Sequence, residues 1–212
     1  MTAKIKLNAA SGGGSISIQA PSSSSNNRVI TLPDIADGTL LTNQSSGLGK
    51  FLKTVQTVKT DTFSESLGAN TNSSTNCIAV TISPSSSSSN VLIVAMLSGS
   101  NSYWTGTSGG GWGGRIVRGS TNIGIGDAAG SRVQQTFRSG AINNSNNVSM
   151  CFVCFLDTGI STTNATTYGV RLDNLDNGTR TTYLNRSLND SDSATNSYRP
   201  ISTLTAIEVA PN

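Results

Sequence analysis

The chain has 212 residues, enough for one ordinary domain with an extension, and only 12% of them are charged. The formal net charge is +3 and the 14 Lys and Arg residues are scattered, which excludes a basic nucleic-acid-binding patch and a disordered polyelectrolyte. Ser, Thr, Asn and Gly alternate with β-branched residues, a composition that is typical of many short strands joined by polar turns.

Residues 1–49 contain short alternating segments, each with a pair of apolar side chains on one face. These pairs are Ile5 with Leu7, Ile16 with Ile18, and Ile30 with Leu32. A buried aliphatic side chain contributes roughly 1.5–3 kcal/mol, too little here to offset the ordering of so long a segment within one chain. We therefore expect the six side chains to form the core of a homotrimer around a three-fold axis, although the neighbours need not be copies of this chain.

A Ser- and Gly-rich linker at 45–49 precedes a second region, residues 50–212. Frequent strand patterns with turn signals between them, and no sustained helical period, predict an antiparallel, jelly-roll-like β-sandwich. The expected strands are 51–59, 77–83, 91–98, 114–118, 122–126, 133–137, 148–156, 167–172, 181–185 and 204–209. VLIVAML (91–97) and VSMCFVCFL (148–156) are nearly continuous apolar runs, so both are expected to be central strands buried on both faces.

The cysteines do not predict a metal or redox site. Cys151 and Cys154 form a C-x-x-C within a strand pattern, and their odd spacing places them on opposite faces. The chain has no His and only one further Cys, Cys77, so a zinc site lacks ligands. We expect three buried free thiols, with a disulfide as the alternative.

No cofactor, metal or catalytic residue is expected. Without His the usual catalytic triads are excluded, and the 11 acidic residues give no carboxylate pair for glycoside cleavage. GIGDAAG (124–130) is not followed by a helix, and DNLDNG (173–178) lacks the later Glu of a calcium loop. Both segments are interpreted as turns.

Aromatic residues in polar loops are the candidate receptor-binding residues. Tyr103, Trp104 and Trp112 lie in the glycine-rich segment NSYWTGTSGGGWGG, and Tyr198 and Arg199 end a second polar loop. Exposed rings beside Asn and Ser can stack on sugars or anchor a protein contact. The alternative is that the rings of the first loop pack against the sandwich or across a subunit boundary.

The order of several segments resembles fibre proteins of tailed bacteriophages, especially those that infect cyanobacteria. SISIQAP followed by RVITLPDIADGTLLT resembles an attachment module of these fibres, and the second region resembles their C-terminal domain. The latter similarity is carried by FLKTVQTVKTDTFS, VTISPSSSSSNVLIVAMLS, RGSTNIGIGDAAGSR, FLDTGISTTNATTYGVRL, TTYLNRS and STLTAIEVA. The resemblance implies a trimeric β-structured virion fibre or spike with the C-terminal domain outermost, although the long shaft of such fibres is absent.

These observations predict a non-enzymatic virion subunit made in the host cytoplasm, because no apolar signal core or membrane span is present. Residues 1–49 would trimerise the chain and attach it to tail, adaptor or capsid proteins. Residues 50–212 would form a head domain that binds a host-surface glycan or outer-membrane receptor. The alternatives are a capsid decoration, cement or head-fibre protein, and a polysaccharide-degrading tail spike.

Overall fold

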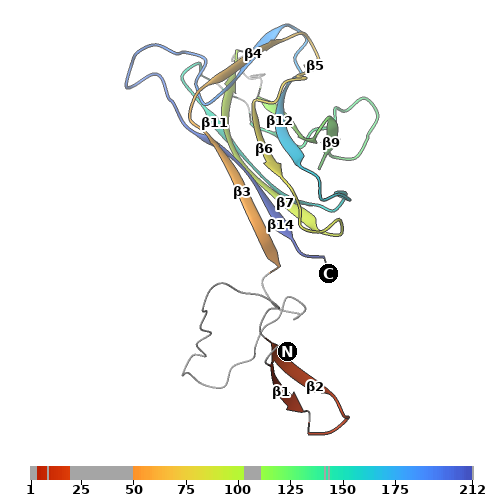
Figure 1. Cartoon of the computed structure of the whole chain (residues 1–212). Coiled ribbons are helices and arrows are strands. Elements are labelled where there is room, and N and C mark those ends of the chain that lie inside the picture. Colours follow the sequence, from red (N-terminus) through yellow and green to blue (C-terminus); the bar gives the residue numbers. More distant parts are fainter. Residues whose placement is uncertain are drawn as a thin grey trace. The chain divides into compact units, whose positions relative to one another are not determined.

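A computed structural model describes residues 4–8, 10–19, 50–102, 111–140, 142 and 144–211 of the chain (Figure 1). The chain divides into two compact units, Met1–Ser45 and Ser46–Asn212. Every described element is a β-strand and every pairing between strands is antiparallel. The expected all-β class is therefore confirmed.

The first unit contains a hairpin of β1 (Lys4–Asn8) and β2 (Ser15–Gln19). Its register places Ile5 opposite Ile18 and Leu7 opposite Ile16. The side chains of Ile5, Leu7 and Ile18 are all exposed. Ile30 and Leu32 lie outside the described residues, and the trimeric packing of this region stays a prediction.

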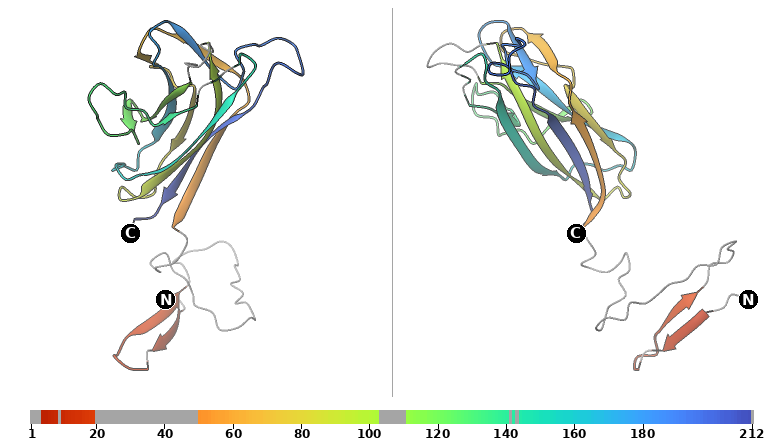
Figure 2. Two further views of the ribbon diagram at one scale, coloured as in Figure 1. Left: turned by 180° about the vertical axis from the view of Figure 1, so that it is seen from behind. Right: turned by 90° about the vertical axis from the view of Figure 1, so that its left-hand side faces the viewer.

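The second unit is a sandwich of two sheets, each with six described strands. The β12 sheet contains β5 (Thr71–Asn72), β6 (Ile78–Ile82), β8 (Gly113–Arg118), β9 (Thr121–Ile123), β10 (Phe137–Arg138) and β12 (Thr166–Asn174). The β7 sheet contains β3 (Phe51–Lys59), β4 (Phe63–Leu67), β7 (Asn90–Asn101), β11 (Ser149–Asp157), β13 (Arg180–Leu184) and β14 (Ser202–Val209). Figure 2 shows β11, β7, β14 and β3 side by side in the second of these sheets.

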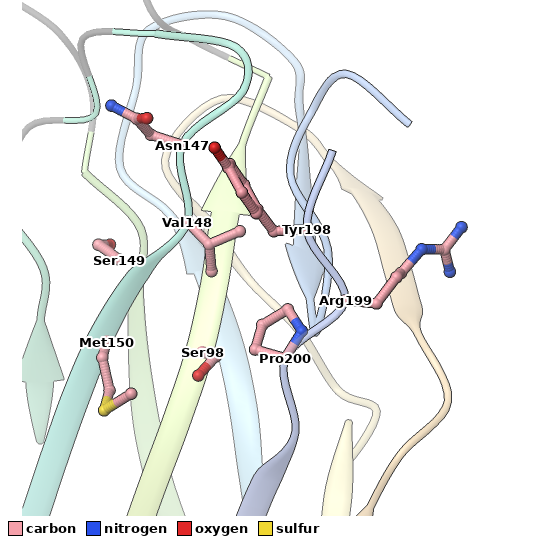
Figure 3. Close-up of a pocket in the computed structure, with 8 residues that line it drawn as sticks. All are labelled: Ser98, Asn147, Val148, Ser149, Met150, Tyr198, Arg199 and Pro200. Carbon is pink, nitrogen blue, oxygen red and sulfur yellow. The ribbon is translucent and has the colours of Figure 1, made fainter. Parts of the chain in front are cut away.

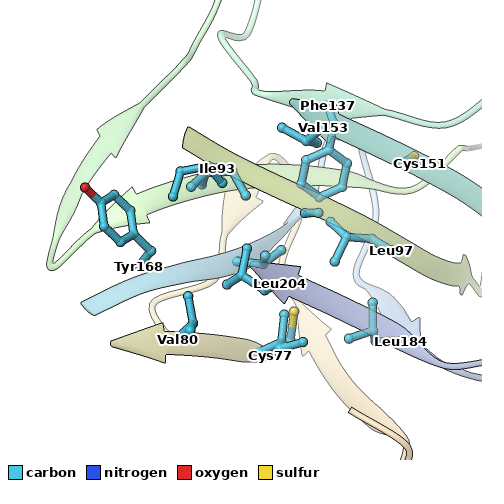
Figure 4. Close-up of a cluster of buried hydrophobic side chains, with 14 of the residues drawn as sticks. Cys77, Val80, Ile93, Leu97, Phe137, Cys151, Val153, Tyr168, Leu184 and Leu204 are labelled. Atoms are coloured by element: carbon cyan, nitrogen blue, oxygen red, sulfur yellow. The ribbon is translucent and has the colours of Figure 1, made fainter. Parts of the chain in front are cut away.

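The hydrophobic core lies between the two sheets and draws side chains from both (Figure 4). Ile93 and Leu97 of β7 meet Leu204 of β14 on one side, and Val80 and Tyr168 belong to the opposite sheet. All but Val80, which is 5% exposed, have no exposed surface. The apolar run of β7 forms a strand because β-branched and aliphatic side chains fit a pleated surface that is covered by neighbours.

The predicted strand at 148–156 is present as β11, but its expected place in the centre of the sheet is wrong. β11 pairs with β7 on one side only, and no other described strand pairs with it. Cys151 and Val153 point into the core, whereas Met150 and Phe152 are exposed by 63% and 69%. The continuous apolar run at 148–156 therefore does not indicate that both faces of the strand are buried within a single chain.

Smaller differences concern the ends of elements. The expected strand at 133–137 shrinks to β10, Phe137–Arg138, and the short strands β4 and β5 had no clear apolar alternation to predict them. The segment 124–130 is irregular, as expected for a turn, so the strand expected at 122–126 ends at Ile123. The turn expected at 173–178 is irregular only from 175, because Asp173 and Asn174 end β12.

Candidate functional site

The predicted aromatic residues have different environments in the structure. Trp112 has no exposed surface: its ring packs edge-on against Phe137, with 5.5 Å between ring centroids. Its indole nitrogen donates a hydrogen bond of 2.7 Å to the Ser149 hydroxyl. The candidate assignment of Trp112 to receptor binding is therefore corrected, because a fully buried ring cannot stack on a ligand. Tyr103 and Trp104 lie outside the described residues.

The second pair of candidates, Tyr198 and Arg199, is exposed. The Tyr198 side chain is 46% exposed, and its hydroxyl donates to the Thr195 carbonyl at 3.3 Å. Arg199 forms an ion pair of 2.7 Å with Asp190, which also lies 3.3 Å from Arg186. Asp190 thus holds two guanidinium groups, and it fixes the position of Arg199 at the end of the loop.

These two residues line a surface pocket of about 540 Å³ (Figure 3). The pocket is formed where two polar loops meet the ends of β7 and β11. Its lining consists of Ser98, Asn147, Val148, Ser149, Met150, Tyr198, Arg199 and Pro200. Figure 3 shows the Arg199 side chain extending away from the Tyr198 ring and from the other labelled side chains.

Hydrogen bonds hold the two loops together at Asn189. Its backbone N–H donates to the Ser145 carbonyl at 2.8 Å, and its side-chain amide donates to Asn146 at 2.9 Å. The Asn189 carbonyl accepts the hydroxyls of Ser187 and Ser197 at 2.6 and 3.0 Å. The pocket wall is therefore fixed before any ligand arrives, which lowers the entropy lost on binding.

Sequence reasoning identified Tyr198 and Arg199 but missed the opposite wall. Asn147 ends the polar segment NNSNN (143–147), and Val148 and Met150 belong to the segment 148–156, which was expected to be a buried strand. The proximity of residues 147–150 to 198–200 depends on the pairing of distant strands. No local pattern in either loop indicates it.

The described carboxylates that are buried have structural partners. Asp157 accepts two hydrogen bonds of 2.7 Å from Arg118 and one of 2.8 Å from the Tyr168 hydroxyl. Asp173 accepts hydrogen bonds of 3.1 Å from Arg115 and Gln135. Burial raises the pKa of Asp173, and the Gln135 and Arg115 donors oppose this effect. Neither carboxylate lines the pocket.

The cysteines are free thiols, as expected, but one of them is exposed. Cys77 and Cys151 are buried, and burial raises their pKa values to about 12 and about 11. Cys154 faces outward, so the expectation that all three are buried is wrong for this residue. Within the ranges that the structure describes, no group of three or more His, Cys, Asp or Glu residues could hold a metal ion.

Comparison with known protein families gives no matching family model, and no curated protein matches the chain. No helix among the described residues is long and apolar enough to cross a membrane. The functional assignment therefore depends on the fold, the pocket and the sequence resemblance.

Proposed function

We propose that this chain is a structural subunit of a tailed-bacteriophage fibre or spike whose head domain binds a host-surface glycan. In this proposal the N-terminal region forms a homotrimer and attaches it to other virion proteins. The observation that supports glycan binding is the pocket at 147–150 and 198–200, which an exposed aromatic ring lines together with amide and hydroxyl side chains.

The chemistry of the pocket suits a neutral or acidic sugar. The exposed face of Tyr198 offers a surface for a sugar ring, and Asn147 adds a donor and an acceptor for hydroxyl groups. Arg199 can donate hydrogen bonds to a carboxylate or sulfate of the glycan beside its contact with Asp190. The lining contains no buried carboxylate, and the proposal assigns binding and no bond cleavage to this site.

A single shallow site of this kind binds weakly. A stacked aromatic contact adds about 0.5–1.5 kcal/mol beyond the burial of its area. A homotrimer carries three such pockets, and one particle carries several fibres. Once one pocket is bound, the others lie at a high effective concentration near the host surface, so weak sites together give strong adsorption. A homotrimer therefore compensates for the weak binding of each single pocket.

The test compares adsorption of purified full-length protein to a panel of cyanobacterial envelope glycans. Tyr198→Ala should abolish adsorption at protein concentrations where the wild type binds, while Tyr198→Phe, which keeps the ring, should retain most of it. Val133→Ala is the matched control, because Val133 is also an exposed apolar residue, at 48%, but does not line the pocket. Equal adsorption of Tyr198→Ala and wild type would reject this pocket as the glycan site.

Location on the particle is tested separately. Labelling of virions with an antibody to the chain should mark tail fibres or spikes. Labelling spread over the capsid would instead indicate a decoration or head-fibre protein. Release of reducing sugar from envelope glycan by the purified protein would contradict the non-enzymatic part of the proposal.

A further inference from the structure

The outward side of the β7 sheet carries a continuous surface without charge. It consists of the outward-pointing side chains at 150–156 of β11, 92–96 of β7, 203–207 of β14 and 54–58 of β3, and we call it the uncharged face. The strand registers align these side chains in rows: Phe152 lies beside Met96, and Met96 beside Thr203. None of the outward side chains is Asp, Glu, Lys or Arg.

The apolar content of this face is concentrated on the edge strand β11. Its outward residues are Met150, Phe152, Cys154 and Leu156, all of them exposed. An exposed edge strand of nine residues normally carries Lys, Pro or a bulge that prevents pairing with other chains. The outward row of β11 has none of these protective residues, which is the expected pattern for a strand that is covered in the assembled protein.

The exposed apolar side chains of the uncharged face form the centre of a candidate protein contact. An aromatic side chain has roughly 150–250 Å² of surface, so Phe152, at 69% exposure, alone presents on the order of 100–170 Å². Met150, Leu156 and Val58, at 63, 44 and 49% exposure, add to this area. The half-buried side chains of β7 and β14 extend the patch toward the ~800 Å² per partner of a standard interface. Apolar patches of a few hundred Å² are the largest that ordinary monomers expose, and such patches often mark interaction sites.

The shape of the face indicates what covers it. Bulky side chains form a ridge along β11, whereas β14 and β3 present a flatter shelf that includes Thr203, Thr205 and Thr54. A ridge from one copy fits on the shelf of another, because sheets pack face to face when side chains interdigitate. A second copy also brings an uncharged surface, so the contact buries no unpaired charge.

We infer that the uncharged face is a subunit interface, covered by a second copy of this chain, with the β11 ridge of one copy seated on the β14–β3 shelf of the next. The contact lies within residues 50–212 and does not depend on host binding. If each copy uses its ridge on one neighbour and its shelf on another, the contact is head-to-tail, and it gives a ring where the rotation between copies closes. The head domains would then hold each other independently of the N-terminal strands.

Cys154 provides a local probe, because it lies within the uncharged face while Cys77 and Cys151 are buried in the core. The experiment measures the rate at which a thiol reagent labels native full-length protein, together with its mass by sedimentation. If nine-tenths of the chains have their uncharged face covered by a second copy, labelling of Cys154 should be about tenfold slower, because only the dissociated fraction reacts. Dilution below the dissociation constant should restore the fast rate.

Phe152→Asp tests the face itself. Phe152 is 69% exposed, so the variant should fold but lose the head-to-head contact, and Cys154 should label at the fast rate even if the N-terminal strands keep the chains together. Met150→Lys, at the neighbouring outward position, gives a second test if Phe152→Asp fails to fold. Val133→Asp is the matched control and should leave labelling slow, because Val133 does not belong to the face.

Three results would overturn the inference. Fast labelling of Cys154 in concentrated wild-type protein would show that the face is free, whatever the oligomeric state. Slow labelling in a monomer would show that another segment of the same chain covers it. Slow labelling in both Phe152→Asp and Met150→Lys, with the mass unchanged, would place the protecting contact elsewhere. Met150 also lines the pocket with Tyr198, so adsorption is compared between wild type and Phe152→Asp alone. Phe152 does not line that pocket, and the inference and the proposed function can therefore fail separately.

Discussion

Trp112 and Ser149 join the two sheets of the sandwich through a hydrogen bond of 2.7 Å from the indole nitrogen to the serine hydroxyl. Trp112 precedes β8 in the β12 sheet, and Ser149 begins β11 in the β7 sheet. The ring also lies against Gly99 of β7, where an added Cβ would come within 2.9 Å of it. A glycine at position 99 is therefore required for the indole to fit.

We predict that Trp112→Ala lowers the free energy of unfolding by about 3–5 kcal/mol, as expected for a buried aromatic ring replaced by a cavity. Trp112→Phe should lose less, because it keeps most of the ring volume and gives up the bond to Ser149. Denaturant unfolding of the purified variants measures both values. Adsorption of folded Trp112→Phe to host envelope should equal that of the wild type; a loss of adsorption with unchanged stability would return Trp112 to the binding site.

Ile93 and Phe152 lie in the two most apolar strands but should respond oppositely to the same change. Ile93 is fully buried, so Ile93→Asp places an unpaired charge in the core and should abolish soluble expression. Phe152→Asp should yield folded protein, because the side chain points away from the core. Soluble yield and circular dichroism decide the matter, and loss of folding in both variants would show that β11 is enclosed within the single chain.

Much of the fold follows from local patterns in the sequence. The alternation in Phe51–Lys59 predicts β3 with the correct ends, and the run at 91–98 predicts the central strand β7. An apolar strand pattern indicates which side chains are removed from water. It does not indicate whether strands of the same chain or another protein cover them. This is why β7 and β11 look alike in sequence, although one is central and the other is an edge strand with an exposed apolar row.

The candidate site was only half predictable for a related reason. Tyr198 and Arg199 stand out as an aromatic and a cation in a polar loop, but the wall at 147–150 joins them through contacts between residues about fifty positions apart, such as Asn146 with Asn196. Trp112 shows the opposite error. Its glycine-rich surroundings suggested exposure, yet Gly99, Phe137 and Ser149, all distant in the sequence, form its pocket.

Glu208 is a buried carboxylate that anchors the serine-rich loop after β6. It has no exposed surface, and its Oε1 accepts the Ser85 N–H, the Ser85 hydroxyl and the Ser89 hydroxyl at 2.7, 2.6 and 2.8 Å. Burial alone would raise the pKa of Glu208, but the hydrogen bonds from Ser85 and Ser89 outweigh burial and lower this pKa below its usual value.

A lowered pKa makes the contribution of Glu208 dependent on pH in a defined direction. Its ionised form stabilises the fold above the unfolded-state pKa of about 4.3, and this contribution is lost as the pH falls through the lower folded-state pKa. We predict that Glu208→Gln lowers neutral-pH stability by about 1.5–3 kcal/mol, the range for hydrogen bonds to a charged group. The difference from wild type should shrink below pH ~4. Glu65→Gln, at the chain's other glutamate, is the control for replacing a glutamate by glutamine. If the difference in unfolding free energy between Glu208→Gln and wild type stays constant with pH, the lowered pKa of Glu208 is wrong.

The last prediction concerns Tyr168, whose buried hydroxyl donates to Asp157 at 2.8 Å while Arg118 holds the same carboxylate. Burial, the hydrogen bond to Asp157 and the charge of Asp157 raise the pKa of Tyr168 above its usual value. A raised pKa means that the stabilisation is fully present below the unfolded-state value of about 10 and is lost as the pH rises through the folded-state value. Tyr168→Phe should therefore lower the unfolding free energy at pH 8 by about 1–2 kcal/mol, but its stability should fall less steeply than that of wild type between pH 9 and ~12.

Tyr198→Phe, at an exposed ring, should leave the stability at pH 8 unchanged. Guanidinium unfolding across this pH range measures each curve, and parallel curves for wild type and Tyr168→Phe would show that the Tyr168 hydroxyl is not enclosed with Asp157.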